Sequence, residues 1–289
     1  MTDLNSLGEH ACFGGTVAFY EHYSSACDAE MRFAAYVPPQ AFAGPVPVLY
    51  YLAGLTSTEE TFMTKGGAQR PASEHGLMLV APDTSPRGLG LPGEDDEYDF
   101  GSGAGFYLDA TVEPFSRHYN TGSYVTRELP QIVEEHFPAS SVRGIFGHSM
   151  GGHGALTLAL KNPDLYASVS AFAPISAPTR VPWGHKAFSG YLGSEEGKWR
   201  EHDASELVRR SPFADGRDIL VDQGTADEFL GEQLYPKVFE EACREAGQPL
   251  TMRWQDGYDH GYYFISTFIA DHVRHHAKTL TGPASDHPD

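Results

Sequence analysis

The chain has 289 residues, of which 40% are hydrophobic, 12% aromatic and 20% charged, and this composition excludes an intrinsically disordered chain. Its formal net charge of −19, from 39 acidic residues against 20 Lys and Arg, disfavours nucleic acid and anionic membrane surfaces as partners, because like charges repel at long range. A few local cations can still hold a small anionic substrate in one cleft.

The cysteines and the first residues of the chain are typical of a protein of the reducing cytoplasm. Cys12, Cys27 and Cys243 are widely spaced and odd in number, so they predict neither a disulfide framework nor a close metal-ligand pair. The first residues carry no basic or apolar leader, and no run reaches the ~20 apolar residues of a membrane helix. We expect a cytoplasmic protein without metal, cofactor or membrane partner, and the sequence leaves a homodimer open.

The predicted elements alternate between strands and helices. Segments 16–22 and 31–37 predict an antiparallel pair. Later apolar runs between Gly, Pro and Asp are typical of buried parallel strands, and they cover residues 46–52, 77–81, 142–146, 168–172, 218–223 and 250–254. Helical patterns cover residues 127–136, 151–161, 235–246 and 262–276. We expect one α/β domain over 1–289, with a mostly parallel sheet, helices on both faces and a polar tail from about residue 281.

Two long polar segments follow predicted strands. Residues 84–105 include five acids between Glu94 and Asp99, and residues 174–189 are rich in Pro with one Trp. Loops that leave the carboxyl ends of strands line the ligand crevice in α/β sheets. We therefore expect both segments to be loops beside the functional site.

A Gly-x-Ser-x-Gly pattern stands between a predicted strand and a predicted helix, at Gly147-His148-Ser149-Met150-Gly151. This setting is that of the nucleophile elbow of the α/β-hydrolase fold. The glycines allow the sharp turn and the close backbone approach, and the Met150 amide at the helix start can donate to an oxyanion. A chance pentapeptide is the alternative in a chain with 31 glycines.

The partners of Ser149 should follow in the order acid, then histidine, each just beyond a later strand. Asp227 and His260 occupy those places. An ionised aspartate would hold the imidazole in the tautomer whose other nitrogen accepts the serine proton. The local alternatives for the orienting acid are Asp222, Glu228 and Asp259.

A second oxyanion donor is expected after the strand at 46–52. The Leu55 amide is the candidate, because Gly54 before it permits close backbone approach. An ordinary strand-to-helix turn would use the same residues. The sequence leaves that alternative open.

The remaining histidines and Cys243 are expected to serve packing or the surface. His148 and His153 flank the elbow without a third metal ligand nearby. Three further histidines near a helix C-terminus would complement the helix dipole at the surface, namely His272, His275 and His276. Charged neighbours of Cys243 predict a largely solvated helix face there.

A wider family signature runs through residues 51–56, 93–95, 99–107, 147–154, 182–184, 186–193 and 222–227. On these segments the chain closely resembles the esterase D family, the S-formylglutathione hydrolases, and the resemblance extends over nearly its whole length. The resemblance implies the same triad.

The resemblance implies hydrolysis of S-formylglutathione to glutathione and formate, the step after glutathione-dependent formaldehyde oxidation, with a glutathione thioester as small-molecule partner. It also implies a substrate pocket bordered by Gly54, Ser57, Phe106, His148 and Trp183. The alternatives are a short-chain carboxylesterase or acyltransferase of the same fold, and a catalytically silent binding protein.

Two positions depart from the family pattern. Many members carry a cysteine where this chain has Ser57, and many have serine where it has Gly261. A serine hydroxyl is far less nucleophilic than a thiolate. We therefore expect thiol reagents to leave this protein active.

Overall fold

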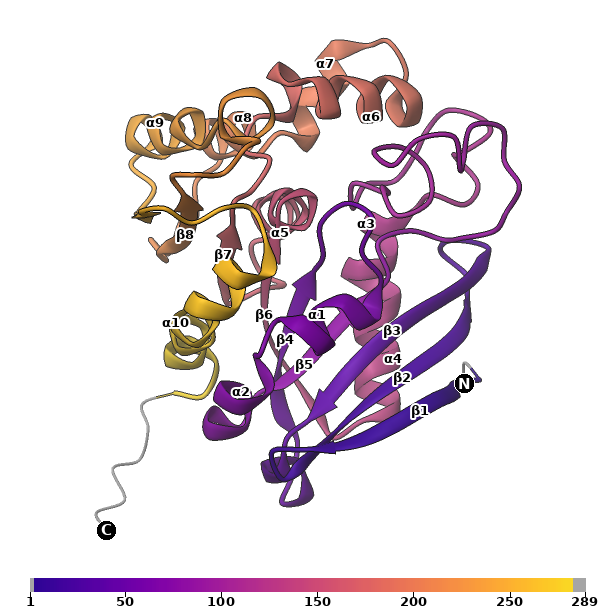
Figure 1. Ribbon diagram of the computed structural model, residues 1–289, viewed down its shortest axis with the longest axis vertical. Coiled ribbons are helices and arrows are strands. Elements are labelled where there is room, and N and C mark those ends of the chain that lie inside the picture. Colours follow the sequence, from indigo (N-terminus) through magenta and orange to yellow (C-terminus); the bar gives the residue numbers. More distant parts are fainter. Residues whose placement is uncertain (1–2, 283–289) are drawn as a thin grey trace.

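The computed structural model describes residues 3–282, and in that part of the chain nine strands form one sheet in the order β1-β2-β3-β5-β4-β6-β7-β8-β9 (Figure 1). Strands β1 to β3 pair antiparallel, β3 pairs antiparallel with β5, and the remaining neighbours are parallel. The predicted mostly parallel sheet with an antiparallel N-terminal portion is confirmed. The strands are β1 Asn5–Cys12, β2 Gly15–Ser24, β3 Ala29–Val37, β4 Val46–Leu52, β5 Met78–Pro82, β6 Ala139–His148, β7 Ser168–Phe172, β8 Ile219–Gly224 and β9 Leu250–Gln255.

Helices lie on both faces of the sheet, with α1, α2 and α10 on one face and α4 and α5 on the other (Figure 1). The four predicted helices are present as α4, α5, α9 and α10. The helices are α1 Glu59–Lys65, α2 Gln69–His75, α3 Thr121–Ser123, α4 Leu129–His136, α5 Met150–Lys161, α6 Pro182–Leu192, α7 Glu196–Trp199, α8 Ala204–Arg210, α9 Pro236–Ala246 and α10 Tyr262–Leu280. Short 3-10 or π-helical turns are η1 Pro39–Phe42, η2 Tyr124–Glu128, η3 Pro178–Arg180, η4 Arg200–His202 and η5 Leu230–Leu234.

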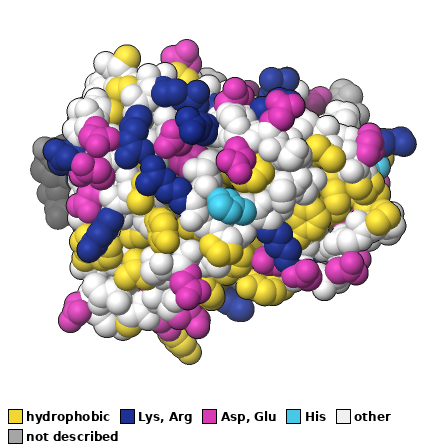
Figure 2. All heavy atoms as spheres, turned by 90° about the horizontal axis from the view of Figure 1, so that it is seen from above, with side chains coloured by type: hydrophobic (Ala, Val, Ile, Leu, Met, Phe, Trp, Pro, Cys, Tyr) yellow, Lys and Arg dark blue, Asp and Glu magenta, His cyan; other side chains and the backbone are white. Residues whose placement is uncertain are grey.

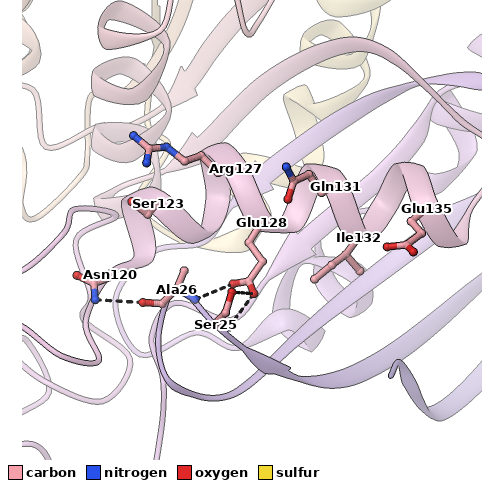
Figure 3. A pocket seen from close by; sticks show the side chains of 9 residues that line it. All are labelled: Ser25, Ala26, Asn120, Ser123, Arg127, Glu128, Gln131, Ile132 and Glu135. Carbon is pink, nitrogen blue, oxygen red and sulfur yellow. Dashed lines mark hydrogen bonds between the residues drawn. The ribbon is translucent and has the colours of Figure 1, made fainter. Parts of the chain in front are cut away.

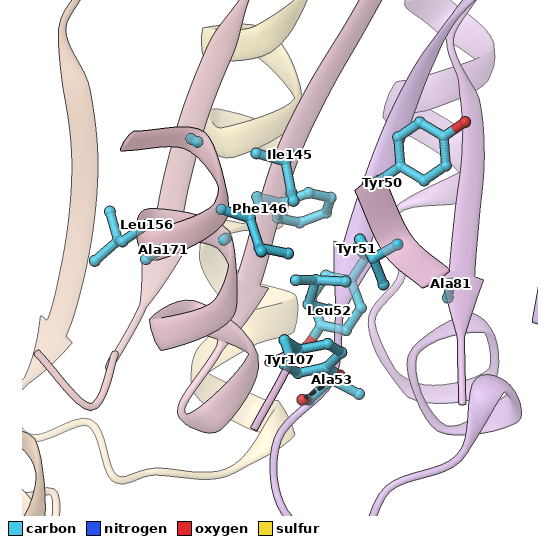
Figure 4. Close-up of a cluster of buried hydrophobic side chains, with 14 of the residues drawn as sticks. Tyr50, Tyr51, Leu52, Ala53, Ala81, Tyr107, Ile145, Phe146, Leu156 and Ala171 are labelled. Atoms are coloured by element: carbon cyan, nitrogen blue, oxygen red, sulfur yellow. Dashed lines mark hydrogen bonds between the residues drawn. The ribbon is translucent and has the colours of Figure 1, made fainter. Parts of the chain in front are cut away.

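The centre of the core lies around β4 and the second half of β6, residues 144–148, which is buried on both faces (Figure 4). Tyr51 stacks on Phe62 at 3.6 Å between ring centroids, and both rings meet the edge of Phe146. Each such buried aromatic contributes on the order of 2 kcal/mol through removal of its surface from water. The ends of β4 and β6, which lead to the site, are therefore held in place by this tightly packed core.

Two elements differ from the prediction. Strand β1 was not predicted, because its residues are largely exposed and show no alternation of apolar and polar side chains. The segment 174–189, predicted as a loop, contains η3 and the first two turns of α6. Pro182 occupies the first helical position, where its missing N–H costs nothing, and Trp183 and Phe188 are buried on the inner side of that helix.

The prediction of a surface role is wrong for His272 and His276. Both are 0% exposed, because the face of α10 that carries them lies against β7. His276 bonds Ser168 Oγ through Nδ1 at 2.6 Å and Ser170 Oγ through Nε2 at 2.8 Å. These serines supply the polar partners that buried imidazoles need.

Cys243 also departs from the prediction of a solvated face. Its helix α9 does expose Glu240, Glu241 and Arg244, but Cys243 itself is 1% exposed. Burial raises the pKa of its thiol to about 12. Of the tail expected from residue 281, positions 283–289 lie outside the described residues. Within residues 3–282, no helix is both long and apolar enough to span a bilayer.

Candidate active site

The turn that follows β6 places Ser149 in a rare backbone conformation. Its φ and ψ are 57° and −118°, a region that costs a non-glycine residue on the order of 1–3 kcal/mol. The turn is fixed because the Ser149 N–H donates to Phe172 O at 3.0 Å, and the His153 N–H donates to Ser149 O at 2.9 Å. The surrounding strands thus maintain the strain at the point where the side chain meets the cavity.

The two glycines of the pattern are required by close contacts. A Cβ on Gly147 would lie 2.2 Å from Gly151 O, and a Cβ on Gly151 would lie 1.9 Å from Leu52 O. Those separations are far below van der Waals contact. The predicted reason for glycine two residues either side of Ser149 is therefore confirmed.

His260 and Asp227 form a direct contact beside this turn. His260 Nδ1 lies 2.7 Å from Asp227 Oδ2, and the Asp227 carboxylate is buried while the imidazole is 14% exposed. The same Oδ2 accepts from Gln223 Nε2 at 3.0 Å, and Oδ1 accepts from the Phe229 N–H at 2.9 Å. An ionised carboxylate only accepts, so His260 carries its proton on Nδ1 and presents Nε2 as an acceptor.

The alternative acids have other contacts. Asp222 is paired with Arg253 at 2.5 Å and lies 3.3 Å from His272 Nε2. The exposed Asp259 accepts the Gly261 N–H at 2.9 Å, and Glu228 is exposed to solvent. Within residues 3–282, Asp227 is the acid whose carboxylate bonds His260.

The predicted oxyanion donors lie where two backbone segments meet. A Cβ on Gly54 would lie 3.2 Å from Ser149 Cβ, so the loop after β4 runs directly past the serine. Thr56 N–H donates to Gly103 O at 2.9 Å, whereas Leu55 N–H and Met150 N–H have no protein acceptor among the described residues. Both amides are free to bind a substrate oxygen.

These residues surround one cavity of about 250 Å³. It brings together Ser149, His260 and Leu55 with four of the five predicted substrate-binding residues. Phe106 is not among them: it is fully buried, with its ring 5.8 Å from that of His153. The lining comprises Gly54, Leu55, Thr56, Ser57, Tyr98, His148, Ser149, Trp183, Phe229, His260 and Tyr262.

His148 lies beside His260, with 4.4 Å between their ring centroids. Burial, reinforced by the neighbouring His260, holds the pKa of His148 well below the ordinary histidine value. His148 is therefore a neutral wall of the cavity. Within residues 3–282, no three His, Cys, Asp or Glu side chains gather in a way that would hold a metal ion.

Tyr98, Phe229 and Tyr262 also line the cavity, although the sequence pattern did not predict them there. Phe229 and Tyr262 each stand two residues after a predicted triad member, and that proximity is the signal that could have found them. Tyr98 lies in the predicted acidic loop, and its hydroxyl accepts from Trp183 Nε1 at 3.3 Å.

A roomier groove of about 580 Å³, which shares no lining residue with this cavity, lies between the β2–β3 turn and α4 (Figure 3). Glu128 binds the backbone N–H groups of Ser25 and Ala26 there at 2.7 and 3.2 Å. Burial alone would raise the pKa of Glu128, but these donors and the neighbouring serine hydroxyls outweigh it and lower the pKa. The groove thus contains a carboxylate committed to anchoring a turn.

Comparison with known proteins identifies the family. The family model described as "Putative esterase" matches residues 24–275. S-formylglutathione hydrolases of Mus musculus and Bos taurus are 56% and 54% identical over 279 residues, covering 96% of this chain and 99% of theirs. The structure of an S-formylglutathione hydrolase from Agrobacterium tumefaciens superposes with a TM-score of 0.92 at 50% identity, over 96% of this chain and 99% of that one. The chain belongs to the S-formylglutathione hydrolase family.

Membership in the S-formylglutathione hydrolase family confirms the resemblance seen in the sequence. The structure shows where Ser57, which departs from the family pattern, lies. Ser57 lines the cavity, and its carbonyl accepts from Thr84 Oγ1 at 2.7 Å and from Arg87 Nη2 at 3.0 Å. Its backbone is therefore fixed by the loop after β5. A side chain substituted at this position would remain at the cavity wall.

Proposed function

We propose that this protein hydrolyses S-formylglutathione to glutathione and formate through a formyl-enzyme on Ser149. The observation that carries the proposal is that Ser149 and His260 line one cavity while the buried Asp227 bonds His260 from behind, in a chain 56% identical over 279 residues to an S-formylglutathione hydrolase. Asp227 and His260 follow β8 and β9, so parallel strands bring them to the same edge of the sheet as Ser149.

In the first half-reaction, Ser149 Oγ attacks the formyl carbon while His260 Nε2 takes the hydroxyl proton. Asp227 stabilises the imidazolium that forms. The tetrahedral oxyanion accepts hydrogen bonds from the Leu55 and Met150 amides. Preorganised donors of this kind are worth roughly 3 kcal/mol each in the transition state.

Collapse of the intermediate breaks the carbon–sulfur bond, and the imidazolium gives its proton to the departing glutathione sulfur. A water molecule then attacks the formyl-enzyme with His260 as base, and formate leaves as Ser149 regains its proton. Because a thiolate is a good leaving group, oxyanion formation is the step in which the amide donors contribute most.

The cavity favours a small acyl group. Leu55, Phe229 and Tyr262 contribute apolar surface to a volume of about 250 Å³, which is below the roughly 300–1,000 Å³ of pockets that enclose whole drug-sized molecules. Burial raises the pKa of Tyr262, so its hydroxyl stays protonated at the cavity wall.

The test compares kcat/KM for S-formylglutathione with that for p-nitrophenyl acetate. We expect a preference for the thioester of at least about tenfold, and labelling of the wild-type protein but not of Ser149→Ala by a fluorophosphonate. Labelling with the opposite preference would instead support a short-chain carboxylesterase. Absence of both labelling and turnover would support a silent binding protein.

We further propose that the protein works in the cytoplasm on this small molecule, without nucleic acid or membrane partners. The net charge of −19 supports the proposal because it opposes binding to anionic polymers and surfaces. Fractionation of cells that express the full chain tests the location. Sedimentation of the purified protein tests the homodimer that the sequence leaves open.

A further inference from the structure

The glutathione moiety must extend beyond the cavity described above. S-formylglutathione is a formylated cysteine with two arms: a γ-glutamyl arm that carries a carboxylate and an ammonium, and a glycyl arm that carries a carboxylate alone. A cavity of about 250 Å³ holds the reacting centre. With the sulfur beside Ser149, the arms leave in opposite directions and meet the rim.

A series of neighbouring rings leads along the cavity wall from Trp183 to Tyr262. Ring centroids are 4.8 Å apart for Trp183 and Phe229, 5.0 Å for Phe229 and His260, 4.4 Å for His260 and His148, and 6.2 Å for His148 and Tyr262. His260 stands in the middle of this series, and Trp183 and Tyr262 are its first and last members. We call these the Trp183 end and the Tyr262 end.

The Trp183 end carries a cation beside acids. Lys186, three residues after Trp183 on α6, binds Asp99 Oδ1 at 2.5 Å and also binds Glu97. These acids flank Tyr98, which accepts the Trp183 indole hydrogen bond. Lys186 and Glu97 keep 32% and 62% of their side-chain surface exposed, so both can meet a ligand. Adjacent opposite charges match the zwitterionic γ-glutamyl end.

The Tyr262 end carries a cation, Lys65, and the nearest acid along the chain, Asp259, is bonded to the Gly261 N–H. Lys65 Nζ lies 6.0 Å from the centroid of the Tyr262 ring, and the side chain is exposed at the end of α1. Within residues 3–282, Lys65 has no salt-bridge partner. The ring face restrains the ammonium beside the cavity wall, where a lone cation matches the lone glycyl carboxylate.

Local charge matters because the protein as a whole repels anions. The net charge is −19, and S-formylglutathione carries two carboxylates against one ammonium. On the face above α6 to α9, Lys and Arg side chains gather among Asp and Glu (Figure 2). A few fixed cations can thus set the local field against an unfavourable total.

We propose that Lys65 binds the glycyl carboxylate of S-formylglutathione and that Lys186, with Glu97 beside it, binds the γ-glutamyl carboxylate and ammonium. The inference rests on the proposed function, and it assigns recognition of the two arms to the two ends of the series of rings. The neutral p-nitrophenyl acetate uses the cavity but neither end.

The first experiment measures the ratio of kcat/KM for S-formylglutathione to kcat/KM for p-nitrophenyl acetate in Lys65→Met. An exposed ion pair is worth up to about fivefold in binding, and we expect the ratio to fall three- to fivefold through a higher KM for the thioester. Lys237→Met is the matched control, because Lys237 Nζ also lies 6.0 Å from an aromatic centroid, that of Trp254, outside the cavity lining. That control should keep the wild-type ratio.

The second experiment assigns the arms. The Lys65→Met effect should vanish with the S-formyl derivative of the glycyl monoethyl ester of glutathione. The fall in the ratio for Lys186→Met, also three- to fivefold, should vanish with S-formyl-cysteinylglycine, which lacks the γ-glutamyl arm. An unchanged ratio in both variants, an equal fall in Lys237→Met, or effects that persist with the truncated substrates would overturn the inference. Failure of the proposed function would appear separately, as a wild-type enzyme that does not prefer S-formylglutathione.

Discussion

Replacement of Asp227 by Asn tests the orienting acid with almost no change of shape. In the native site Oδ1 accepts from the Phe229 N–H at 2.9 Å, while Oδ2 accepts from both Gln223 Nε2 at 3.0 Å and His260 Nδ1 at 2.7 Å. If the Asn oxygen keeps the Phe229 bond, its NH₂ group faces His260 and Gln223. The NH₂ group then donates to Nδ1, and the imidazole takes the tautomer with its proton on Nε2.

That tautomer cannot accept the proton of Ser149. If the Asn amide flips instead, its NH₂ group opposes the Phe229 N–H, and a buried donor is left unpaired at about 1–3 kcal/mol. The comparable substitution in a serine protease lowers kcat about 10⁴-fold. We expect a loss of 10³- to 10⁴-fold in kcat for S-formylglutathione, with the melting temperature lowered by a few degrees because a buried hydrogen bond is lost.

The controls are Asp259→Asn and Glu228→Gln, which remove nearby carboxylates that are exposed and do not contact His260. Steady-state kinetics with S-formylglutathione should show both within about threefold of wild type. If Asp227→Asn kept a tenth of wild-type kcat, or if either control were equally impaired, the assignment of Asp227 would be refuted.

Three further predictions concern strain, thiols and acid. Ser149→Gly should lose at least ~10³-fold in activity yet gain about 1 kcal/mol in unfolding free energy, measured in urea, because glycine relieves the positive φ of 57°. Iodoacetamide should leave activity intact, since burial raises the pKa of Cys243 to about 12, whereas Ser57→Cys should become sensitive in the same assay. Burial lowers the pKa of His276 well below its ordinary value, so its stabilising contribution is present above the unfolded value of ~6.5 and is lost as pH falls. His276→Asn should therefore reduce the loss of unfolding free energy between pH 6.5 and 5, measured in urea, by roughly 1 kcal/mol per pH unit.

The parallel strands and the residues at their ends could be predicted from the sequence for a physical reason. A strand buried on both faces contains a continuous apolar run, and β6 and β8 carry such runs at Ile145–Phe146 and at Ile219–Val221. Because parallel strands share an edge, chain order alone brings Ser149, Asp227 and His260 toward one place. Strand β1, exposed on both faces, lacks that pattern and was missed.

The cavity wall depends on packing that a single segment does not encode. Tyr98 reaches the site only because its hydroxyl meets the indole of Trp183, 85 residues away in sequence. Likewise, His272 and His276 lie inside because α10 covers the serines of β7. The local pattern of α10 fits a surface position equally well, and the hydroxyl partners that make burial favourable come from a distant strand.

Asp222 shows how three-dimensional contacts separate two acids that the sequence leaves as alternatives. Asp222 belongs to β8, and its side chain lies on the face of the sheet that α10 covers, instead of at the edge where the strands end. Arg253 from the neighbouring β9 forms an ion pair with it at 2.5 Å. Burial alone would raise the pKa of Asp222, but His272 and Arg253 lower it. Removing this carboxylate would leave Arg253 and His272 without their shared partner and would therefore lower the free energy of unfolding. Asp227 lies five residues later and past the end of the strand, and within residues 3–282 its one ion-pair partner is His260, whose imidazolium forms during the proposed turnover. That difference favours Asp227 as the orienting acid and makes stability, not kcat alone, the measurement that distinguishes substitutions at the two positions.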